Sequence, residues 1–169
     1  STDLFAPILL AIEDFDSARA GDELSRLAAM LNPRDLVYKV ALPLMREVGF
    51  RWHEGTLSTA QEHLVSQLLR NLMGNMVRLF RPAQPAMKMV MATPAGESHE
   101  FGILAAAMLT SAIGIEVVYL GADLPASEIV DAARHVSARV ILLGITIISG
   151  TTAEEVRAIT ASMPEDCKL

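Results

Sequence analysis

Residues 87–102 read Met-Lys-Met-Val-Met-Ala-Thr-Pro-Ala-Gly-Glu-Ser-His-Glu-Phe-Gly, a short apolar run followed by a polar loop. The apolar run from Met87 to Thr93 predicts a strand. The small residues from about Phe101 to Ile113 predict a helix. A strand, a loop and a helix in this order favour a parallel sheet with right-handed crossovers.

The same alternation continues downstream to Leu169. The patterns predict strands and helices in turn at Glu116–Leu120, Pro125–Val136, Val140–Gly144 and Thr151–Ala161, with Cys167–Leu169 beginning a further strand. We therefore predict an α/β, Rossmann-like parallel sheet domain over residues 86–169 that is incomplete at its C-terminal end. Three strands are few for such a domain, so we expect the chain to be part of a longer protein.

Upstream, Arg81-Pro82-Ala83-Gln84-Pro85 has two prolines and no periodicity, which is typical of a linker. The residues before it have helical periodicity and predict an all-α, four-helix bundle over residues 1–81. We expect its helices over Leu4–Phe15, from a capping Asp22, from Asn32-Pro33 to Gly55 with a kink at Pro43, and from a capping box at Ser58–Gln61 to about Phe80.

Apolar residues at a spacing of about four predict the buried faces of the last two helices. These residues are Leu36, Val40, Leu44, Val48 and Trp52 in the third helix, and Leu64, Leu68, Leu72, Met76 and Leu79 in the fourth. On this pattern alone, Trp52 is interpreted as a core residue.

Polar side chains gather where these two helices meet. Trp52 and His53 lie near the end of the third helix, and Glu62 and His63 lie in the first turns of its antiparallel neighbour. The four side chains are therefore expected at the same end of the bundle. An alternative interpretation is that Glu62 and His63 are solvated surface residues, with Glu62 favoured by the helix dipole.

A second polar group follows the first strand, where Glu97, Ser98, His99 and Gly102 are found. Ligands on parallel sheets bind at the carboxyl ends of the strands, so this loop and the Gly144-Ile145-Thr146 turn belong to one candidate site. Glu97 can accept the second ring N–H of His99, and Gly102 lets the next helix pack closely. Alternatively, His99 is an ordinary hydrogen-bonded surface residue.

Composition limits the possible functions. The 169 residues are 51% hydrophobic and carry a net charge of −6, so the chain offers no basic stripe for binding phosphate backbones. DNA binding would require a domain outside this chain. No apolar run approaches the ~18–20 residues of a membrane span, and no basic signal-peptide region is visible. The lone Cys167 is typical of the reducing cytoplasm, where we expect the protein.

The pattern Glu97-x-His99-x-x-Gly102 resembles the base-off, His-on motif of cobalamin-binding domains, which usually begins with Asp. That family has a Ser-x-Leu turn about 41 residues later. Here residues 103–143 precede Gly144-Ile145-Thr146, with Gly in place of Ser and Thr in place of Leu. The resemblance implies that His99 is the lower axial ligand of cobalt, and that Ser98, Gly102, Gly144 and Thr146 contribute to the cofactor site.

The helical region resembles one group within that family. Methionine synthase and corrinoid methyl carriers also place a helical cap before the sheet domain. Trp52, nine residues and then Glu62-His63 are similar to the signature of adenosylcobalamin light-sensing regulators of the CarH type. The resemblance implies that Trp52 packs on the adenosyl group, that Glu62 hydrogen-bonds it and that His63 shapes the same pocket. Light would cleave the Co–C bond, and His53 would then join His99 as a cobalt ligand.

The function implied is that of a cobalamin-binding photoreceptor module of a transcriptional regulator, a homo-oligomer and not an enzyme. Adenosylcobalamin is the expected cofactor, with methylcobalamin and hydroxocobalamin as open alternatives. A corrinoid carrier for methyl transfer is the main alternative function, although Trp52 and His53 would obstruct the upper face that a carrier keeps open. A cobalamin-binding antirepressor that acts through a regulator protein is the third possibility.

Overall fold

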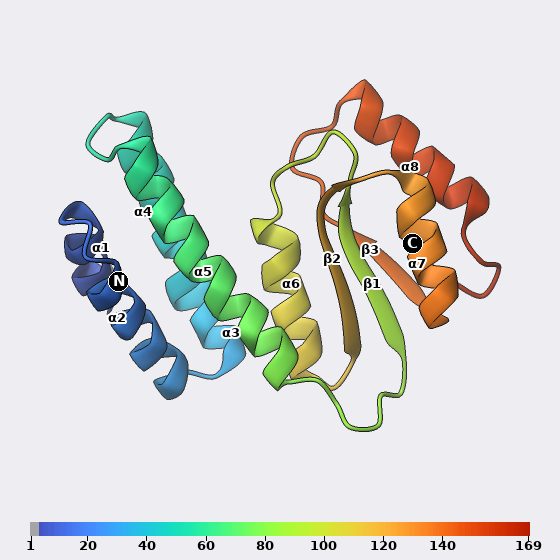
Figure 1. Ribbon diagram of the computed structural model, residues 1–169, viewed down its shortest axis with the longest axis horizontal. Helices are drawn as coiled ribbons and strands as arrows, with labels where there is room; N and C mark the ends of the chain where they lie inside the picture. Colours follow the sequence, from blue (N-terminus) through green and yellow to red (C-terminus); the bar gives the residue numbers. More distant parts are fainter. Residues whose placement is uncertain (1–3) are drawn as a thin grey trace. The chain divides into compact units, whose positions relative to one another are not determined.

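Residues 4–169 are described by the computed structural model, in a helical unit that ends at Asn75 and a sheet unit from Met76 to Leu169 (Figure 1). The helical unit contains α1 (Ala6–Glu13), α2 (Ser17–Met30), α3 (Pro33–Asp35), the π-helix η2 (Leu36–Ala41), α4 (Leu42–His53) and most of α5 (Thr59–Leu79). Because α3, η2 and α4 follow one another without a loop, these segments correspond to the four expected helices.

The second helix begins earlier than predicted. Its capping residue is Asp16, whose side chain accepts a hydrogen bond of 3.0 Å from the backbone N–H of Arg19. Asp22, the predicted cap, lies inside α2. The reason is the sharp turn before it: Phe15 adopts a left-handed backbone with φ of 53°, so the chain reverses within a few residues and the next helix starts at once.

The third helix is deformed ahead of Pro43, where a kink was expected. Proline has no N–H to donate to the carbonyl four residues back, and its ring crowds that carbonyl. The chain responds with the wide turns of η2, in which the backbone N–H of Leu42 bonds to the carbonyl of Val37, five residues back. The distortion is therefore a π-helical segment that keeps backbone groups hydrogen-bonded.

The buried face of α5 differs from the prediction. Its buried side chains are Val65, Leu69, Met73 and Met76, whereas Leu64, Leu68 and Leu72 are half-buried and Leu79 is 79% exposed. Neighbouring stripes on a helix lie only about 100° apart, so a four-residue spacing does not show which stripe is central. The predicted face was therefore displaced by one residue over most of its length.

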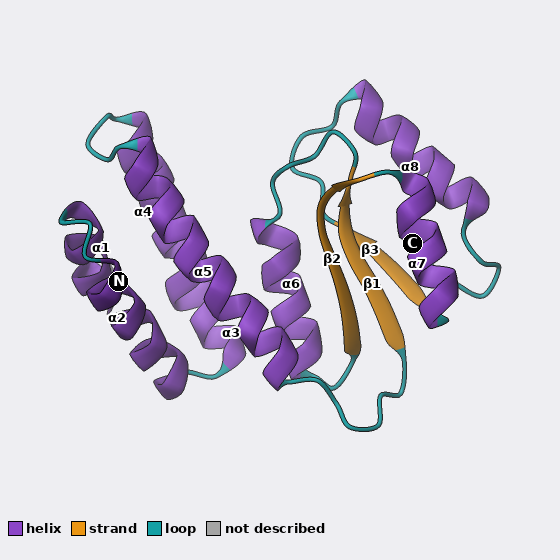
Figure 2. Ribbon diagram, viewed as in Figure 1, coloured by secondary structure: helices purple, strands orange, loops and turns teal. Residues whose placement is uncertain are grey.

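The sheet unit has the predicted alternation of strands and helices (Figure 2). Its strands β1 (Lys88–Pro94), β2 (Glu116–Leu124) and β3 (Val140–Leu143) are parallel and lie in the order β2-β1-β3. They alternate with α6 (Phe101–Ala112), α7 (Ala126–Val136) and α8 (Gly150–Ser162). Lys168 forms an isolated parallel bridge with Val140, and the further strand predicted from Cys167 onward stays a prediction.

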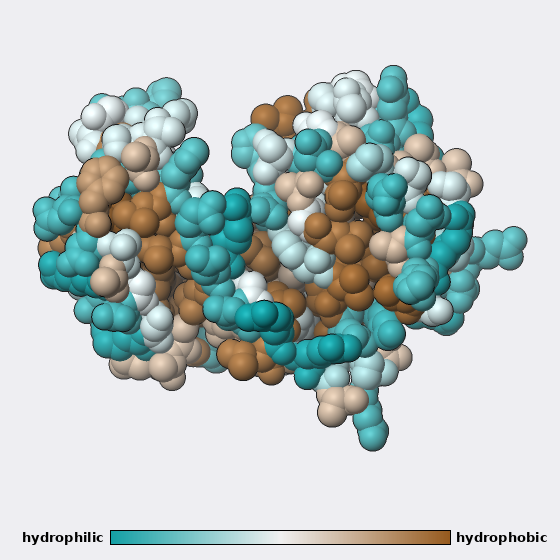
Figure 3. All heavy atoms as spheres, in the orientation of Figure 1, coloured by the Kyte–Doolittle hydropathy of each residue, from teal (hydrophilic) through white to brown (hydrophobic). Residues whose placement is uncertain are grey.

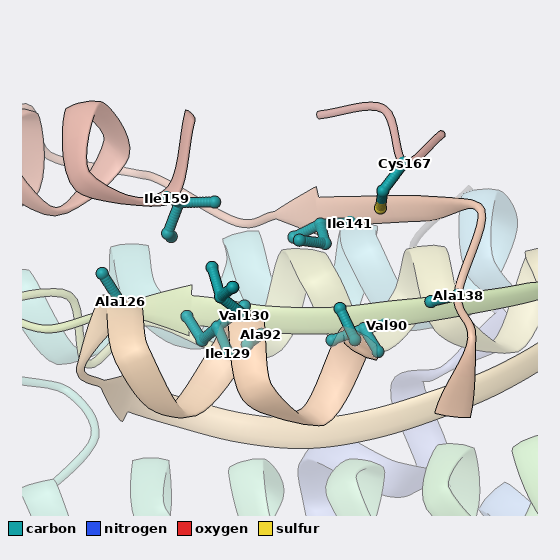
Figure 4. Packing of buried hydrophobic residues seen from close by; sticks show 10 residues of the cluster. Val90, Ala92, Ala126, Ile129, Val130, Ala138, Ile141, Ile159 and Cys167 are labelled. Carbon is teal, nitrogen blue, oxygen red and sulfur yellow. The ribbon is translucent and has the colours of Figure 1, made fainter. Parts of the chain in front are cut away.

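Alternating residues of β1 face two different cores, because successive side chains of a strand point to opposite faces. Val90 and Ala92 belong to a cluster with residues of β3, α7 and α8 (Figure 4). Met91 instead packs with Ile103 and Ala107 of α6. Full burial of each large side chain stabilises the fold by about 1.5–3 kcal/mol. Both faces of the central strand are thus covered, and its carboxyl end is held firmly.

The second strand is longer than predicted and runs to Leu124 rather than Leu120. Its pairing with β1 shifts register after Met91 and again after Ala92, which is the pattern of a β-bulge. Gly121 and Asp123, with φ of 95° and 60°, provide the left-handed backbone of this irregular end. Among residues 4–169, the structure has no helix whose length and apolar character would allow it to cross a membrane.

Candidate functional site

The loops that follow the three strands carry a group of hydrogen-bonded polar residues at one edge of the sheet. We call this group the sheet-edge site. It consists of the side chains of Thr93, Glu97, His99 and Asp123 and the backbone of Gly96, Thr146 and Ile147. The prediction that the His99 loop and the turn after β3 lie together is confirmed.

The Glu97 carboxylate is at the centre of the sheet-edge site, with only 1% of the residue exposed. One oxygen, Oε1, accepts hydrogen bonds from the backbone N–H of His99 at 2.8 Å and lies 2.6 Å from the ring Nδ1 of His99. The other, Oε2, accepts from the backbone N–H groups of Thr146 at 2.6 Å and Ile147 at 2.9 Å. Each oxygen therefore has two partners.

These hydrogen bonds determine the charge of Glu97. Burial alone would raise its pKa, but the backbone N–H groups of Ile147, His99 and Thr146 and the His99 ring together lower the pKa to about 2. An ionised carboxylate can only accept, so the proton of the neutral ring lies on Nδ1 of His99 and the lone pair lies on Nε2. The predicted contact between Glu97 and His99 is confirmed, and it leaves Nε2 as the ring nitrogen with a free lone pair in the neutral ring.

The His99 side chain is 60% exposed, so its ring is accessible from solvent. Ser98 and Gly102 are also exposed. A Cβ atom built at Gly102 would meet no protein atom within 4 Å, so packing within this chain does not require glycine there. The absent side chain instead leaves open space at the start of α6, close in sequence to His99. The expectation that Gly102 lets α6 approach whatever the His99 loop holds therefore applies to a bound ligand, and it stays a prediction.

Gly144 has the opposite character. A Cβ atom at this position would lie 2.7 Å from Cβ of Ile103, so the α6 side chain excludes the Ser that the cobalamin-binding motif has here. The lost hydroxyl is not needed to satisfy Glu97, because the backbone of Thr146 and Ile147 binds its carboxylate directly. This contact was not predicted, since it depends on backbone groups and has no residue-type signature.

The turn after β3 also exposes apolar side chains. Ile145, Ile147 and Ile148 are 39%, 59% and 85% exposed, and hydrophobic residues appear at the upper edge of the sheet unit in Figure 3. Contiguous exposed apolar side chains are typical of a surface that binds a ligand or a partner. The sheet-edge site therefore presents an imidazole nitrogen near an apolar turn.

The helical unit carries a second group, which we call the helix-end cluster. It consists of Trp52, His53, Thr59, Glu62, His63 and Ser66. Trp52 is 50% exposed, so its interpretation as a core residue is wrong. Its indole Nε1–H donates a hydrogen bond of 3.1 Å to Oγ1 of Thr59, the first residue of α5. This bond confirms that Trp52 lies beside the start of the next helix.

Glu62 has two neighbours within α5, of which Ser66, four residues on, lies on the same helical face and His63 is the next residue in the chain. Its Oε1 accepts a hydrogen bond of 2.7 Å from the hydroxyl of Ser66, and its Oε2 lies 3.5 Å from Nε2 of His63. The predicted capping box at the start of α5 is confirmed, because Ser58 and Gln61 exchange backbone-to-side-chain hydrogen bonds of 2.8 and 3.2 Å. His53 and His63 are both exposed.

Sequence reasoning missed several members of both groups. Thr59 and Ser66 could have been found from helical spacing, since they lie three residues before and four residues after Glu62. Thr93 and Asp123 each lie at the carboxyl end of a strand, which is where polar residues of parallel sheets form sites. The predicted strand end at Leu120 removed Asp123 from consideration.

Comparison with known proteins points to one family. Residues 4–76 and residues 87–166 each match a family model described as a B12 binding domain. The chain is 35% identical over 149 residues to the HTH-type transcriptional repressor CarH of Myxococcus xanthus. The aligned region is 88% of this chain and 48% of that protein. The chain thus spans about half the length of this relative.

Similarity extends to proteins named for corrinoids. Trimethylamine corrinoid protein 1 of Methanosarcina mazei is 27% identical over 158 residues, which is 86% of this chain and 71% of that protein. The structure of the monomethylamine corrinoid protein of Methanosarcina barkeri has a TM-score of 0.71 at 17% identity, covering 99% of this chain and 82% of that chain. At such low identity, this likeness concerns the fold, and it agrees with the predicted Rossmann-like domain after a helical region.

Proposed function

Because this chain belongs to the B12-binding family and is homologous to the CarH-type cobalamin-binding regulators, we propose that it is the light-sensing part of a transcriptional regulator. The observation that carries the proposal is the His99 ring of the sheet-edge site. Its Nδ1 is bound to a buried, ionised carboxylate, and its Nε2 remains available on an exposed side chain. Such a carboxylate partner orients metal-bound histidines and makes them more basic.

The sheet unit would hold cobalamin from its lower side. Nε2 of His99 would bind cobalt, and Glu97 would keep the ring in the required tautomer. The exposed Ile145, Ile147 and Ile148 offer apolar contact to a corrin ring. No protein atom lies within 4 Å of where a Cβ of Gly102 would be, so this position leaves room beside the ligand. Ser98 and Thr146 are exposed in the same loops and can contribute polar contacts.

The helix-end cluster would serve the upper side. The half-exposed indole of Trp52, fixed by Thr59, would pack on the upper axial group. Glu62, fixed by Ser66, would hydrogen-bond that group, with His63 beside it. Bound adenosylcobalamin supplies a Co–C bond that visible light cleaves. His53, exposed at the end of α4, would be a second imidazole available to hold the cobalt once the adenosyl group has left.

This exchange of a large group for a protein ligand would be the signal. Binding of His53 in place of the adenosyl group would be coupled to a change in the helical unit and, through it, in the assembly of a homo-oligomer. The chain itself, with a net charge of −6, is poorly suited to DNA binding. Control of transcription would thus act through a DNA-binding domain outside this chain or through a regulator protein.

A second candidate function is a corrinoid carrier for methyl transfer, which the similarity to trimethylamine corrinoid protein 1 supports. A carrier needs an upper face open to methyl donors and acceptors. The exposed indole of Trp52 and the exposed imidazole of His53 favour the sensor, because both would compete for that face.

Absorption spectra test the choice. The protein is mixed with adenosylcobalamin in the dark and then illuminated with green light. For a sensor, the spectrum is expected to change on illumination to a lasting low-spin Co(III) form, and the illuminated protein is then expected not to bind added adenosylcobalamin. Binding of methylcobalamin with no lasting photoproduct, and methyl exchange with a thiol, would support the carrier instead. Absence of binding to either cobalamin would refute both.

A further inference from the structure

Asp123 occupies an unusual place at the end of β2. Its backbone is left-handed with φ of 60°, a conformation that few residues other than glycine adopt and that Asp and Asn tolerate best. Here the chain leaves regular pairing with β1, which shifts register twice between Met91 and Pro94. The conformation is useful because it turns both the backbone N–H and the carboxylate of Asp123 toward the loop after β1.

The carboxylate and the N–H of Asp123 make separate contacts. Oδ1 accepts a hydrogen bond of 2.8 Å from the backbone N–H of Gly96, itself left-handed with φ of 87°. The N–H of Asp123 donates one of 2.9 Å to Oγ1 of Thr93. The hydroxyl of Thr93, which is fully buried, donates in turn to the backbone carbonyl of Glu97. Asp123 is therefore connected to the backbone of Glu97 through the hydroxyl of Thr93.

The loop is consequently held from two sides. On one side, Asp123 of β2 accepts from the backbone N–H of Gly96, and Thr93 of β1 donates to the backbone carbonyl of Glu97. On the β3 side, the backbone of Thr146 and Ile147 binds the Glu97 carboxylate. The position of Glu97 then determines where the His99 ring lies, through the 2.6 Å contact to Nδ1.

We propose that Asp123 is a positioning residue for His99, and that it orients the axial imidazole by fixing the loop from Pro94 to Ser98 before any cofactor binds. The inference rests on the proposed function, in which His99 binds cobalt. Asp123 need not touch the cofactor or His99. It acts through Gly96, Thr93 and Glu97, and its contribution is to keep Nε2 aimed at one point in space.

Two substitutions separate the carboxylate from the backbone conformation. Asp123→Gly keeps the left-handed backbone and the N–H bond to Thr93 but removes the acceptor for Gly96. Asp123→Asn keeps a side-chain acceptor and tolerates the same φ. Ser137→Gly is the matched control, because Ser137 is also left-handed with φ of 54° in the same unit, at the end of α7.

The first measurement uses the protein without cofactor. Amide hydrogen exchange at Gly96, followed by NMR, is expected to be about tenfold faster in Asp123→Gly, since the hydrogen bond that protects this N–H is gone. Asp123→Asn and Ser137→Gly are expected to exchange at Gly96 as the wild type does. Equal protection of Gly96 in Asp123→Gly and in the wild type would overturn the proposal.

The second measurement uses protein that carries His53→Ala in every variant compared, so that His53 cannot supply the ligand, labelled with ¹⁵N-histidine and loaded with hydroxocobalamin that is then reduced to Co(II). In the EPR spectrum, a ¹⁵N ligand splits each cobalt line into two, whereas the ¹⁴N of the cofactor's own base splits it into three. The wild type, Asp123→Asn and Ser137→Gly are expected to show doublets. Asp123→Gly is expected to lose a large part of the doublet at equal bound cobalt, with affinity reduced by about tenfold.

The two hypotheses fail in different ways. A wild type without the doublet overturns the proposed function and this inference with it. A full doublet in both the wild type and Asp123→Gly overturns the inference alone. If Asp123→Gly does not fold, Thr93→Val repeats the second measurement, because it removes the hydroxyl that links Asp123 to Glu97 and leaves the Gly96 bond in place. A merely structural role would lower stability without changing the fraction of histidine-ligated cobalt.

Discussion

The sheet-edge site and the helix-end cluster hold their functional side chains in different ways. At the sheet edge, a carboxylate that is 1% exposed receives three backbone N–H groups and a ring N–H from two loops. In the helix-end cluster, a half-exposed Trp52 and an exposed His63 are held by side-chain contacts within α5 and to its first residue. The first arrangement suits a permanent ligand and the second suits a group that must move.

Because backbone hydrogen bonds hold the sheet-edge site, we expect it to be the more rigid of the two. Each N–H that binds Glu97 belongs to a segment anchored by a buried strand, so the carboxylate cannot rotate without leaving donors unsatisfied. In contrast, Glu62 can change rotamer at the loss of one hydroxyl contact. A sensor that retains its lower ligand and exchanges its upper one would need this asymmetry.

Removal of His99 is expected to give the largest effect on the first region. We expect His99→Ala to weaken cobalamin binding by at least about 100-fold, more than the loss of a supporting residue. The fold should persist, because the backbone N–H of residue 99 and those of Thr146 and Ile147 still bind Glu97. Equilibrium titration followed by absorbance gives the affinity in dark and illuminated samples. Unchanged affinity in both would exclude His99 as a ligand.

The next substitution, Glu97→Gln, tests the carboxylate itself. Whichever way the amide is turned, its NH₂ group must face N–H donors from His99 or from Thr146 and Ile147. We expect the free energy of unfolding to fall by about 1–3 kcal/mol and cobalamin affinity to fall by about 10–100-fold. Urea unfolding and titration measure the two quantities. A Gln variant as stable as the wild type would contradict the buried acceptor role.

The contribution of Glu97 also has a defined pH dependence. Its folded-state pKa of about 2 is below the usual value of 4.5, so the stability it provides is complete above pH 4.5. It is lost progressively as the pH falls from 4.5 through about 2. The stability difference between the wild type and Glu97→Gln should therefore shrink over this range. A difference that stays constant down to acid pH would mean that the pKa of Glu97 is not lowered in the folded protein.

Two glycines separate the needs of the fold from those of the ligand. Gly144→Ala places a Cβ 2.7 Å from Cβ of Ile103, and we expect a loss of about 1–3 kcal/mol in the free energy of unfolding. Gly102→Ala adds a Cβ to open space, so stability should change little. Under the proposed function, however, this second variant should bind cobalamin more weakly. If Gly102→Ala binds normally, the open space beside the loop is not part of the cofactor site.

Much of the sheet-edge site could be predicted from local patterns. The strand before Glu97, the helix after it and the contact between Glu97 and His99 involve residues close together in the sequence. The partners of Glu97 on the other loop lie 49 and 50 residues away, and Asp123 lies 27 residues from Gly96. Such pairs depend on strand order and on the irregular register between β1 and β2, which periodicity does not encode.

The helical unit was predicted less completely, for a different reason. The number of helices and the capping box at Ser58 follow from local signals. The spacing of apolar residues did not identify the buried face of α5, and it placed Trp52 in the core, where it does not lie. The packing partners decide which apolar side chains remain exposed. For Trp52, the apolar spacing predicted a core residue, whereas the family resemblance predicted a residue that contacts the cofactor.

The smallest effect on the folded protein is expected for a substitution in the helix-end cluster, at His53. His53 is exposed at the end of α4, so His53→Ala should change the free energy of unfolding by no more than about 0.5 kcal/mol. Dark binding of adenosylcobalamin should also be unchanged, because His53 acts only after the adenosyl group has left. The illuminated spectrum should differ, since the upper axial position can no longer receive this imidazole. Identical illuminated spectra would show that His53 is not the replacement ligand. His135→Ala is the matched control, because His135 is an exposed histidine of α7 that belongs to neither group.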